Sequence, residues 1–410
     1  MNYNEGGAQS KPQRRKALNI LFITPEYPKR KQPTTGFPNY LYRVSLSLIQ
    51  LGHKPIILSA GDCDGHRVEE GIEIWTVRRP YSAEHRLYAL NYMENAWRIG
   101  SRLSQKIEEL EKKMPIDIVQ FPSLYGLALF YRGKIPAILR FSSYSKKAFA
   151  SFQTHSRMEV AVMSLFERLS ARKCLALISP CKNTAEAFMK DCHRKVKVIE
   201  TPFVNDVKEY DNQFYEDILK EKKYALFFGT LYAEKGILVI AEVLESFLRE
   251  NPDYYFVFLG GTTDINGECS ANILQKSAGR YADRVIISKA LPHEQLYPVI
   301  RYADFIVQPS FMENLSNACI EAMYFEKVVI GTDGASFEQL ITHGQNGLLC
   351  RIGDSKDLLE KMQMAVSMDR KKKIEMGRMA KCRIDKLRPE YVVKKLVRLY
   401  EYVLSNSPNK

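Results

Sequence analysis

The sequence lacks the patterns that mark secreted, membrane-spanning and metal-binding proteins. No apolar run approaches the roughly 18 residues that a spanning helix needs, and the first residues do not form the apolar core of a secretory signal. The eight cysteines include neither a Cys-x-x-Cys pair nor a cluster with metal-ligand spacing. Free thiols in a reducing compartment are therefore expected. We predict a cytoplasmic protein without a spanning helix.

Two families of binding motif are also missing. There is no RNP motif and no zinc knuckle, so nucleic acid is not the expected partner. Leu18–Thr24 is the first predicted strand, and no Gly-x-Gly-x-x-Gly follows it. A nicotinamide-dependent oxidoreductase would fit two βαβ domains, but the missing glycine motif makes it the less favoured alternative.

Length and composition indicate a globular protein of two domains. The chain has 410 residues, of which 45% are hydrophobic and 26% charged. The net charge of +13 is concentrated in the first half, because residues 1–205 carry 32 lysines and arginines against 18 acidic residues. Residues 206–410 carry 28 lysines and arginines against 29 acidic residues. This excess suggests an acidic partner, and a solvated basic surface is the simpler alternative.

The most informative stretch is Ser310–Met323, which contains two glutamates with seven residues between them. It follows Phe305–Pro309, an apolar run that predicts a buried parallel strand. Its own apolar pattern predicts a helix packed on a sheet. Asn314 or Ser316 can cap that helix.

A capped helix of this kind offers an anion site. The N–H groups from Leu315 to Asn317 would be free at the positive helix end, where phosphate binds readily. Glu313 lies in the turn, and Glu321 lies roughly 7.5 Å further along the axis. The two carboxylates are therefore expected to contact different parts of one long ligand.

Together with neighbouring motifs, this stretch resembles a known family. Val328–Thr332, Ser336–Ile341 and Gly344–Leu349 follow it in order. The set is similar to the retaining GT-B glycosyltransferases of family 4, over about residues 17–405 and most specifically in the second half. The resemblance implies an α/β fold with two Rossmann-like domains facing each other across a cleft, and a C-terminal helix that crosses back to the first domain.

The resemblance also implies the domain organisation. We expect a disordered basic arm at residues 1–16 and an acceptor-side domain at residues 17–205. A nucleotide-sugar-binding domain would cover residues 206–390. Residues 391–410 would hold the returning helix.

The implied reaction moves a sugar from a nucleoside diphosphate to a hydroxyl group with retention of configuration. Glu313 would bind donor-sugar hydroxyls and Lys235 would neutralise the diphosphate, as the two catalytic candidates. Glu321 would bind the ribose. The other donor-binding candidates are Gly36, Gly229, Thr230, Gly261, Ala290, Leu291, Asn314, Leu315 and Ser316. No Asp-x-Asp triplet follows a predicted strand, so we expect no metal and no cofactor besides the donor.

The chain departs from the family pattern at two positions. Thr230 stands where most relatives carry arginine beside the glycine, which removes one expected cation. Ser142 stands where a histidine often lies near the donor sugar. Arg140 and Ser143 are the nearby polar alternatives for sugar or acceptor contacts.

Several expectations concern helices outside this site. Residues 78–103 predict a helix lining the cleft, residues 124–131 a short helix, and residues 144–173 one long amphipathic helix. The histidines at 53, 155, 193, 293 and 343 are expected to be surface or packing residues.

The acceptor is expected to be a saccharide or a lipid-linked saccharide in bacterial envelope or capsule synthesis. Three alternatives stay open: a non-catalytic GT-B binding module, a two-carboxylate hydrolase, and the oxidoreductase above. The basic first half also raises the hypothesis of docking on an anionic membrane at the inner face. If the positive charge were spread evenly around the first domain, the hypothesis of membrane docking would lose its support.

Overall fold

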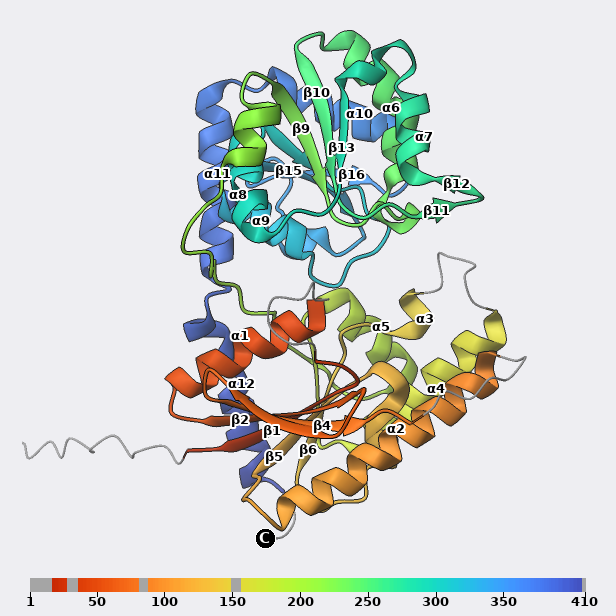
Figure 1. Cartoon of the computed structure of the whole chain (residues 1–410), viewed down its shortest axis with the longest axis vertical. Coiled ribbons are helices and arrows are strands. Elements are labelled where there is room, and N and C mark those ends of the chain that lie inside the picture. Colours follow the sequence, from red (N-terminus) through yellow and green to blue (C-terminus); the bar gives the residue numbers. More distant parts are fainter. Residues whose placement is uncertain (1–16, 28–35, 81–87, 149–155, 408–410) are drawn as a thin grey trace, which may run out of the picture.

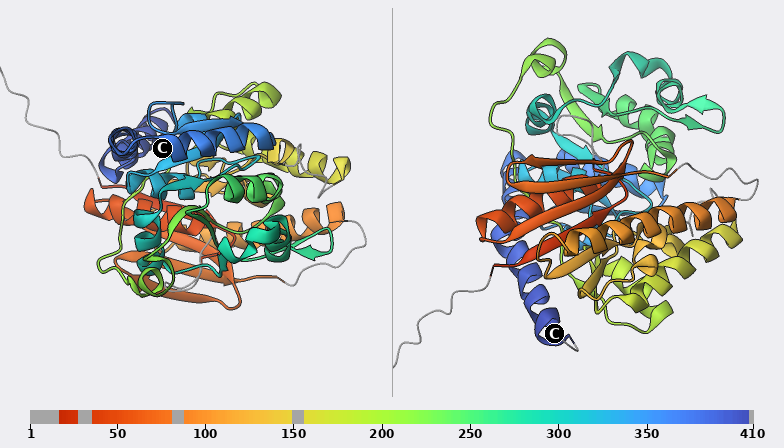
Figure 2. Two further views of the ribbon diagram at one scale, coloured as in Figure 1. Left: turned by 90° about the horizontal axis from the view of Figure 1, so that it is seen from above. Right: turned by 60° about the horizontal axis from the view of Figure 1, so that its bottom comes forward.

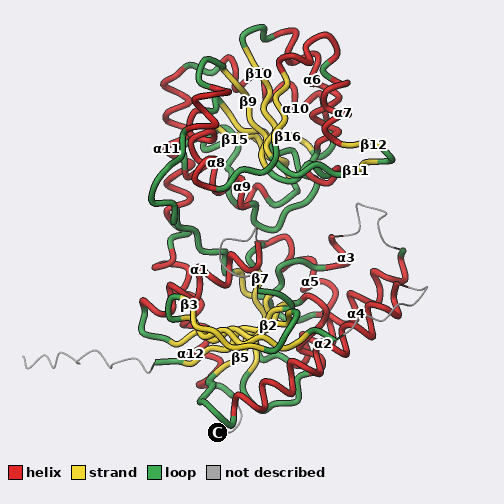
Figure 3. The backbone as a smooth tube through the Cα atoms, in the orientation of Figure 1, coloured by secondary structure: helices red, strands yellow, loops and turns green. Residues whose placement is uncertain are grey.

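The computed structural model describes residues 17–27, 36–80, 88–148 and 156–407, in two lobes stacked one above the other (Figure 1). Each lobe is built on one sheet with helices on both faces, as the tube drawing shows (Figure 3). This confirms the predicted α/β architecture of two Rossmann-like domains. The predicted basic arm, residues 1–16, lies outside the described residues.

The first sheet has eight strands in the order β3-β4-β2-β1-β5-β6-β7-β8. All neighbours are parallel except β3 and β4, which form an antiparallel edge that the sequence analysis did not predict. The strands are β1 (Asn19–Thr24), β2 (Lys54–Gly61), β3 (Gly65–Glu69), β4 (Ile72–Arg78), β5 (Ile118–Pro122), β6 (Ala137–Arg140), β7 (Ala176–Ser179) and β8 (Lys197–Val198).

The second sheet has six parallel strands in the order β13-β10-β9-β14-β15-β16. A separate hairpin, β11 with β12, projects from this domain. The strands are β9 (Lys223–Phe228), β10 (Tyr254–Leu259), β11 (Asp264–Ile265), β12 (Glu268–Cys269), β13 (Val285–Ser288), β14 (Phe305–Val307), β15 (Val328–Asp333) and β16 (Leu348–Arg351). Central strands such as β9 are buried along nearly their whole length, because helices cover both faces of a parallel sheet.

Helices connect the strands in the usual parallel-sheet order. The first domain holds α1 (Gly36–Gln50), α2 (Tyr88–Glu111), α3 (Ser145–Ala148), α4 (Arg157–Lys173) and α5 (Lys182–Cys192). The second holds α6 (Ile237–Glu250), α7 (Ser270–Ser277), α8 (His293–Tyr302), α9 (Asn317–Tyr324), α10 (Ser355–Ser367) and α11 (Arg370–Asp385). Short 3₁₀ or π turns are η1 (Leu124–Phe130), η2 (Tyr215–Leu219), η3 (Ala233–Lys235), η4 (Gly279–Arg284) and η5 (Phe337–Gln339).

The last helix, α12 (Pro389–Ser405), returns to the first domain, as predicted. It runs from the second lobe down along the first-domain sheet (Figures 1 and 2). Its buried face joins one hydrophobic cluster with residues of α1, β1 and β2. The buried residues are Val392, Val393, Leu396, Val397, Leu399, Tyr400 and Val403. Each such side chain contributes roughly 1.5–3 kcal/mol when fully buried, so α12 is part of the first domain's core.

Three predicted helices need correction. The helix predicted over residues 78–103 is α2, which begins at Tyr88; residues 81–87 lie outside the described part. It packs against α4 and η1 instead of lining the cleft. The helix predicted over 144–173 is two helices, because Ser156 and Glu159 form a capping box that starts α4 afresh. The short helix at 124–131 is the 3₁₀ turn η1, broken by a positive φ of 57° at Tyr125.

Candidate active site

Two loops of the second domain approach each other at the carboxyl ends of β9 and β14. Gly236 has a φ of 78°, and a Cβ there would lie 2.1 Å from the carbonyl oxygen of Pro309. Only glycine permits this approach. The backbone N–H of Phe311 donates to the carbonyl oxygen of Glu234 at 2.9 Å, which ties the two loops together.

This approach brings together the two predicted catalytic residues. Lys235 Nζ lies 2.5 Å from Glu313 Oε1, and Ser310 Oγ donates to the same oxygen at 3.0 Å. The Lys235 side chain is 33% exposed and the Glu313 side chain 12% exposed. The pair therefore faces solvent at its lysine end, where a ligand can reach it.

The N-terminus of α9 lies next to this pair. Ser316 is the cap, because its Oγ accepts from the backbone N–H of Cys319 at 3.2 Å. The backbone N–H groups of Leu315, Ser316 and Asn317 donate to no protein acceptor within the described part of the chain. These N–H groups are free at the positive helix end, where the sequence analysis predicts an anion site.

Asn314, the other predicted cap, has a different role. Its amide oxygen accepts from Thr184 Oγ1 of the first domain at 2.7 Å. Its amide nitrogen donates to the carbonyl oxygen of Ser142, also in the first domain. The residue immediately before the free N–H groups is therefore fastened to the opposite domain.

A cavity of about 350 Å³ opens between the domains at this point. Its second-domain wall contains the lysine–glutamate pair and the start of α9. Its first-domain wall contains Tyr40, Arg140, Ser142 and Thr201 among others. The second-domain lining residues are Phe228, Gly229, Lys235, Gln308, Glu313, Asn314, Leu315, Ser316, Asn317 and Ala318.

Glu321 lies apart from Glu313, as its spacing predicted. It is 7% exposed, and burial raises the pKa of its carboxyl group to about 7. His293 Nε2 lies 3.6 Å from Glu321 Oε1, and the imidazole stacks on Tyr297. Burial lowers the pKa of His293 and raises that of Glu321, so both shifts work against a full ion pair at this contact.

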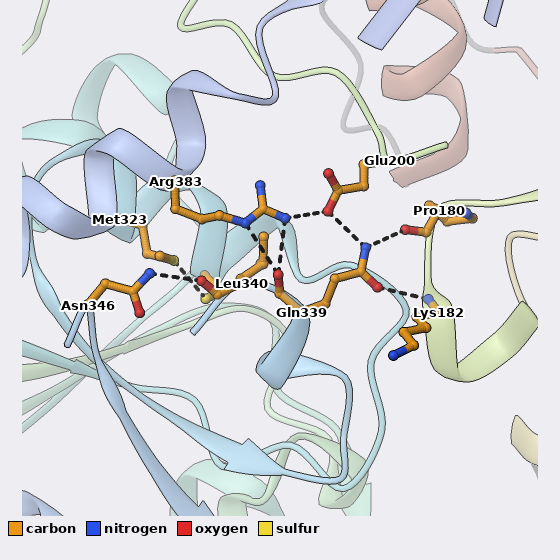
Figure 4. A network of polar contacts seen from close by, with 9 residues as sticks. Pro180, Lys182, Glu200, Met323, Gln339, Leu340, Asn346 and Arg383 are labelled. Atoms are coloured by element: carbon orange, nitrogen blue, oxygen red, sulfur yellow. Dashed lines mark hydrogen bonds and ion pairs between the residues drawn. The ribbon is translucent and has the colours of Figure 1, made fainter. Parts of the chain in front are cut away.

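A network around Gln339 holds the two domains together (Figure 4). Gln339 Nε2 donates to the carbonyl oxygen of Pro180 at 2.8 Å and to Glu200 Oε1 at 2.9 Å. Its Oε1 accepts from the backbone N–H of Lys182 at 2.8 Å. Arg383 completes the network by pairing with Glu200 and donating to the carbonyl oxygen of Gln339.

Known proteins match this arrangement. Residues 209–382 match the family described as glycosyl transferases group 1. The chain is 24% identical over 339 residues to a GDP-mannose:cellobiosyl-diphosphopolyprenol alpha-mannosyltransferase of Xanthomonas campestris, covering 78% of this chain and 85% of that protein. This chain is a glycosyltransferase, and its likeness to group 1 lies in the second domain.

Solved structures show that the glycosyltransferase has a GT-B fold. The sucrose-phosphate synthase of Thermosynechococcus elongatus superposes with a TM-score of 0.75 at 16% identity, covering 95% of this chain and all of that one. A glycosyltransferase from Rickettsia africae superposes with a TM-score of 0.68 at 17% identity, covering 95% and 100%.

The structure brings about half of the predicted site residues of the glycosyltransferase into one cavity. Arg140, Ser142, Gly229, Lys235, Glu313, Asn314, Leu315 and Ser316 line it. The residues that do not line it are Gly36, Ser143, Thr230, Gly261, Ala290, Leu291 and Glu321. Gly36 is the first residue of α1, and Leu291 precedes α8, whose His293 meets Glu321. The ribose and base candidates thus lie beside the cavity instead of in it.

Sequence reasoning did not single out the first-domain residue Tyr40. His293 was expected to be a surface or packing residue, and it stacks on Tyr297; it also contacts Glu321, the predicted ribose ligand. Tyr40 lines the cavity beneath Arg140. Its position on the predicted helix after β1 was the only available signal, because that helix begins at the cleft.

Proposed function

We propose that this enzyme transfers a sugar from a nucleoside-diphosphate donor to a hydroxyl acceptor with retention of configuration. The observation that carries this proposal is the placement of Lys235 and Glu313 beside free helix N–H groups in a cavity between two domains. Such a site offers positive charge and N–H donors to a diphosphate, and a carboxylate to sugar hydroxyls.

Each group has a definite part in this reaction. Negative charge accumulates on the diphosphate as the glycosidic bond breaks, and Lys235 with the N–H groups of Leu315 and Ser316 stabilises that charge. Preorganised donors of this kind are commonly worth about 3 kcal/mol each in the transition state. Glu313, held by Ser310 and Lys235, orients the donor sugar. With retention and no covalent nucleophile assigned, the acceptor hydroxyl attacks the face that the diphosphate leaves, and its proton passes to the departing phosphate oxygen.

The acceptor that we propose is a lipid-linked saccharide of a bacterial envelope polysaccharide. Support comes from the Xanthomonas relative, whose name gives a diphosphopolyprenol-linked acceptor. The hypothesis of an anionic membrane surface as partner belongs here as well. No helix in the described ranges is both long and apolar enough to cross a bilayer, so any such docking would use the surface.

The surface that supports membrane docking is the outer face of α2 and α4. Leu90, Met93 and Trp97 lie one turn apart on α2 and are 46%, 41% and 54% exposed. Met158 and Leu165 of α4 are 58% and 42% exposed. An exposed apolar stripe in the half of the chain (residues 1–205) that carries 32 basic against 18 acidic residues suits an anionic bilayer.

Release of nucleoside diphosphate from a panel of nucleotide sugars tests the reaction itself. Glu313→Gln should lose nearly all transfer while keeping the fold, because a charged hydrogen bond worth roughly 1.5–3 kcal/mol disappears. Asp304→Asn is the matched control: Asp304 also pairs with a lysine, Lys373, at 2.6 Å, but away from the cavity. More than half of wild-type turnover in the Glu313 variant would refute its role.

Vesicle co-sedimentation tests the membrane hypothesis. Binding to phosphatidylglycerol vesicles should exceed binding to neutral vesicles and fall at high salt. Met93→Ser with Trp97→Ser should weaken it, whereas Tyr402→Ser, at a 66% exposed position on α12, should not. No binding at low salt would remove the membrane hypothesis, and binding that ignores lipid charge would remove its electrostatic basis.

A further inference from the structure

We propose that Arg140 forms a second anion-binding subsite, on the first-domain wall of the cavity, for a phosphate or carboxylate group of a bound substrate. The inference rests on the proposed function only for the identity of that substrate. The anion can belong to the acceptor or to the donor diphosphate, and both sources share one chemistry.

The first observation is a buried cation without a counter-ion. Arg140 is the last residue of β6 and is 2% exposed. Its guanidinium donates to two neutral hydroxyls, Ser142 Oγ at 3.2 Å and Thr201 Oγ1 at 3.0 Å. Its Nε meets no acceptor, and no carboxylate pairs with it among the described residues. A buried charge in this state is costly until an opposite charge reaches it.

The second observation is that the guanidinium is held in a fixed plane. Its Cζ lies 3.7 Å from the ring centroid of Tyr40. The Tyr40 hydroxyl accepts from Gln120 Nε2 at 3.2 Å, and Tyr400 of α12 donates to Gln120 Oε1 at 2.8 Å. The stack and its buried support restrict the guanidinium, whose planar fork can bind carboxylate or phosphate through two hydrogen bonds.

The third observation is the balance of charge in the cavity. Three charged residues occur among its described lining: Arg140, Lys235 and Glu313. Lys235 and Glu313 neutralise each other. One positive charge therefore remains, and it belongs to the first domain. A ligand that spans the cavity can place one anionic group at the α9 N-terminus and another at Arg140.

Calorimetric titration with inorganic phosphate and pyrophosphate tests the subsite directly. Arg140→Gln should weaken binding of these probes at least about tenfold, the loss of a charge-assisted pair. Arg140→Lys keeps the positive charge but loses the planar guanidinium with its two parallel donors. Its affinity for the probes should therefore lie between those of the wild type and Arg140→Gln. Arg194→Gln is the control, because Arg194 is a first-domain arginine that donates to backbone carbonyls and does not line the cavity. Circular dichroism checks that each variant is folded.

A second titration, with phosphate added at saturating UDP or GDP, separates the two sources. If the wild type still binds phosphate at saturating UDP or GDP and Arg140→Gln does not, the subsite belongs to an acceptor anion. Phosphate that is displaced, with weaker UDP or GDP binding in Arg140→Gln, assigns it to the donor diphosphate.

The subsite is refuted if Arg140→Gln binds phosphate, pyrophosphate and the nucleotides as the wild type does. If Arg140→Gln does not fold, unchanged phosphate and pyrophosphate binding in Arg140→Lys refutes it as well. A wild type that binds phosphate through Arg140 but binds neither nucleotide would retain the subsite and remove the proposed function.

Discussion

The substitution Glu321→Gln should change how the stability of the protein depends on pH. Glu321 is buried in the second domain, and burial raises its pKa to about 7 from an ordinary value of 4.5. Between these two pH values the folded protein binds one proton more than the unfolded chain. Its stability therefore falls as pH rises from about 4.5 to 7, and is constant with respect to this group outside that window.

The magnitude follows from the size of the pKa shift. Each unit corresponds to about 1.4 kcal/mol, so the carboxyl group should cost the folded state roughly 3 kcal/mol above pH 7. Glutamine has nearly the same shape but never ionises. Glu321→Gln should therefore be as stable as the wild type near pH 4.5 and more stable by up to about 3 kcal/mol at pH 8.

Urea unfolding at several pH values measures this difference, and the chain offers a matched control. Glu167 of the first domain is also buried, and burial raises its pKa to about 8. Both tryptophans, Trp75 and Trp97, lie in the first domain, so their fluorescence follows that domain while circular dichroism follows both. Glu167→Gln should therefore change the pH dependence of the fluorescence transition up to about pH 8. Glu321→Gln should leave the fluorescence transition nearly unchanged and act on the second-domain part of the circular-dichroism transition.

The reasoning fails if Glu321→Gln shows the same stability difference at pH 5 and pH 8. That result would mean that the carboxyl group ionises as easily in the folded protein as in the unfolded chain. A pH-dependent difference confined to Glu167→Gln would refute the prediction for Glu321 and leave the one for Glu167 standing.

Three further substitutions test the cleft. Lys235→Ala should weaken UDP or GDP binding at least about tenfold more than binding of the parent nucleoside, and equal losses in calorimetry would make the lysine structural. Thr230→Arg should tighten diphosphate binding by adding a cation near Gly229, unless a basic residue already fills that space, in which case affinity stays constant. Gln339→Ala should open the domains in small-angle scattering and lower kcat without weakening nucleotide binding, whereas Gln345→Ala, at an exposed position, should do neither.

The fold was predictable from the sequence because its sheets consist of short apolar runs separated by turn residues. β9 and β14, for example, are buried runs that predict parallel strands without knowledge of their neighbours. Helix boundaries were less predictable. A helical period continues across residues 144–173, and only the serine–glutamate spacing of the capping box at Ser156 signals a new start.

The sequence indicated candidate site residues one at a time, but not how they are arranged. Lys235 and Glu313 are 78 residues apart in sequence, and each was selected separately from its own turn. Their direct contact depends on the approach of Gly236 to Pro309, which no local pattern encodes. The position of Arg140 is similar: its stacking on Tyr40 depends on how α1 crosses the end of β6.

One residue, Asn314, couples the contact between the domains to the predicted anion site of the second domain. Asn314 fastens the start of α9 to Thr184 and to the backbone of Ser142, which also accepts a hydrogen bond from Arg140 through its hydroxyl. Neighbouring Leu315 carries one of the N–H groups that face the cavity. Separating the domains would release Asn314 and move Arg140 away from the lysine–glutamate pair. If both proposals hold, the predicted anion site at α9 and the Arg140 subsite would therefore act on one bound ligand only while the domains are together.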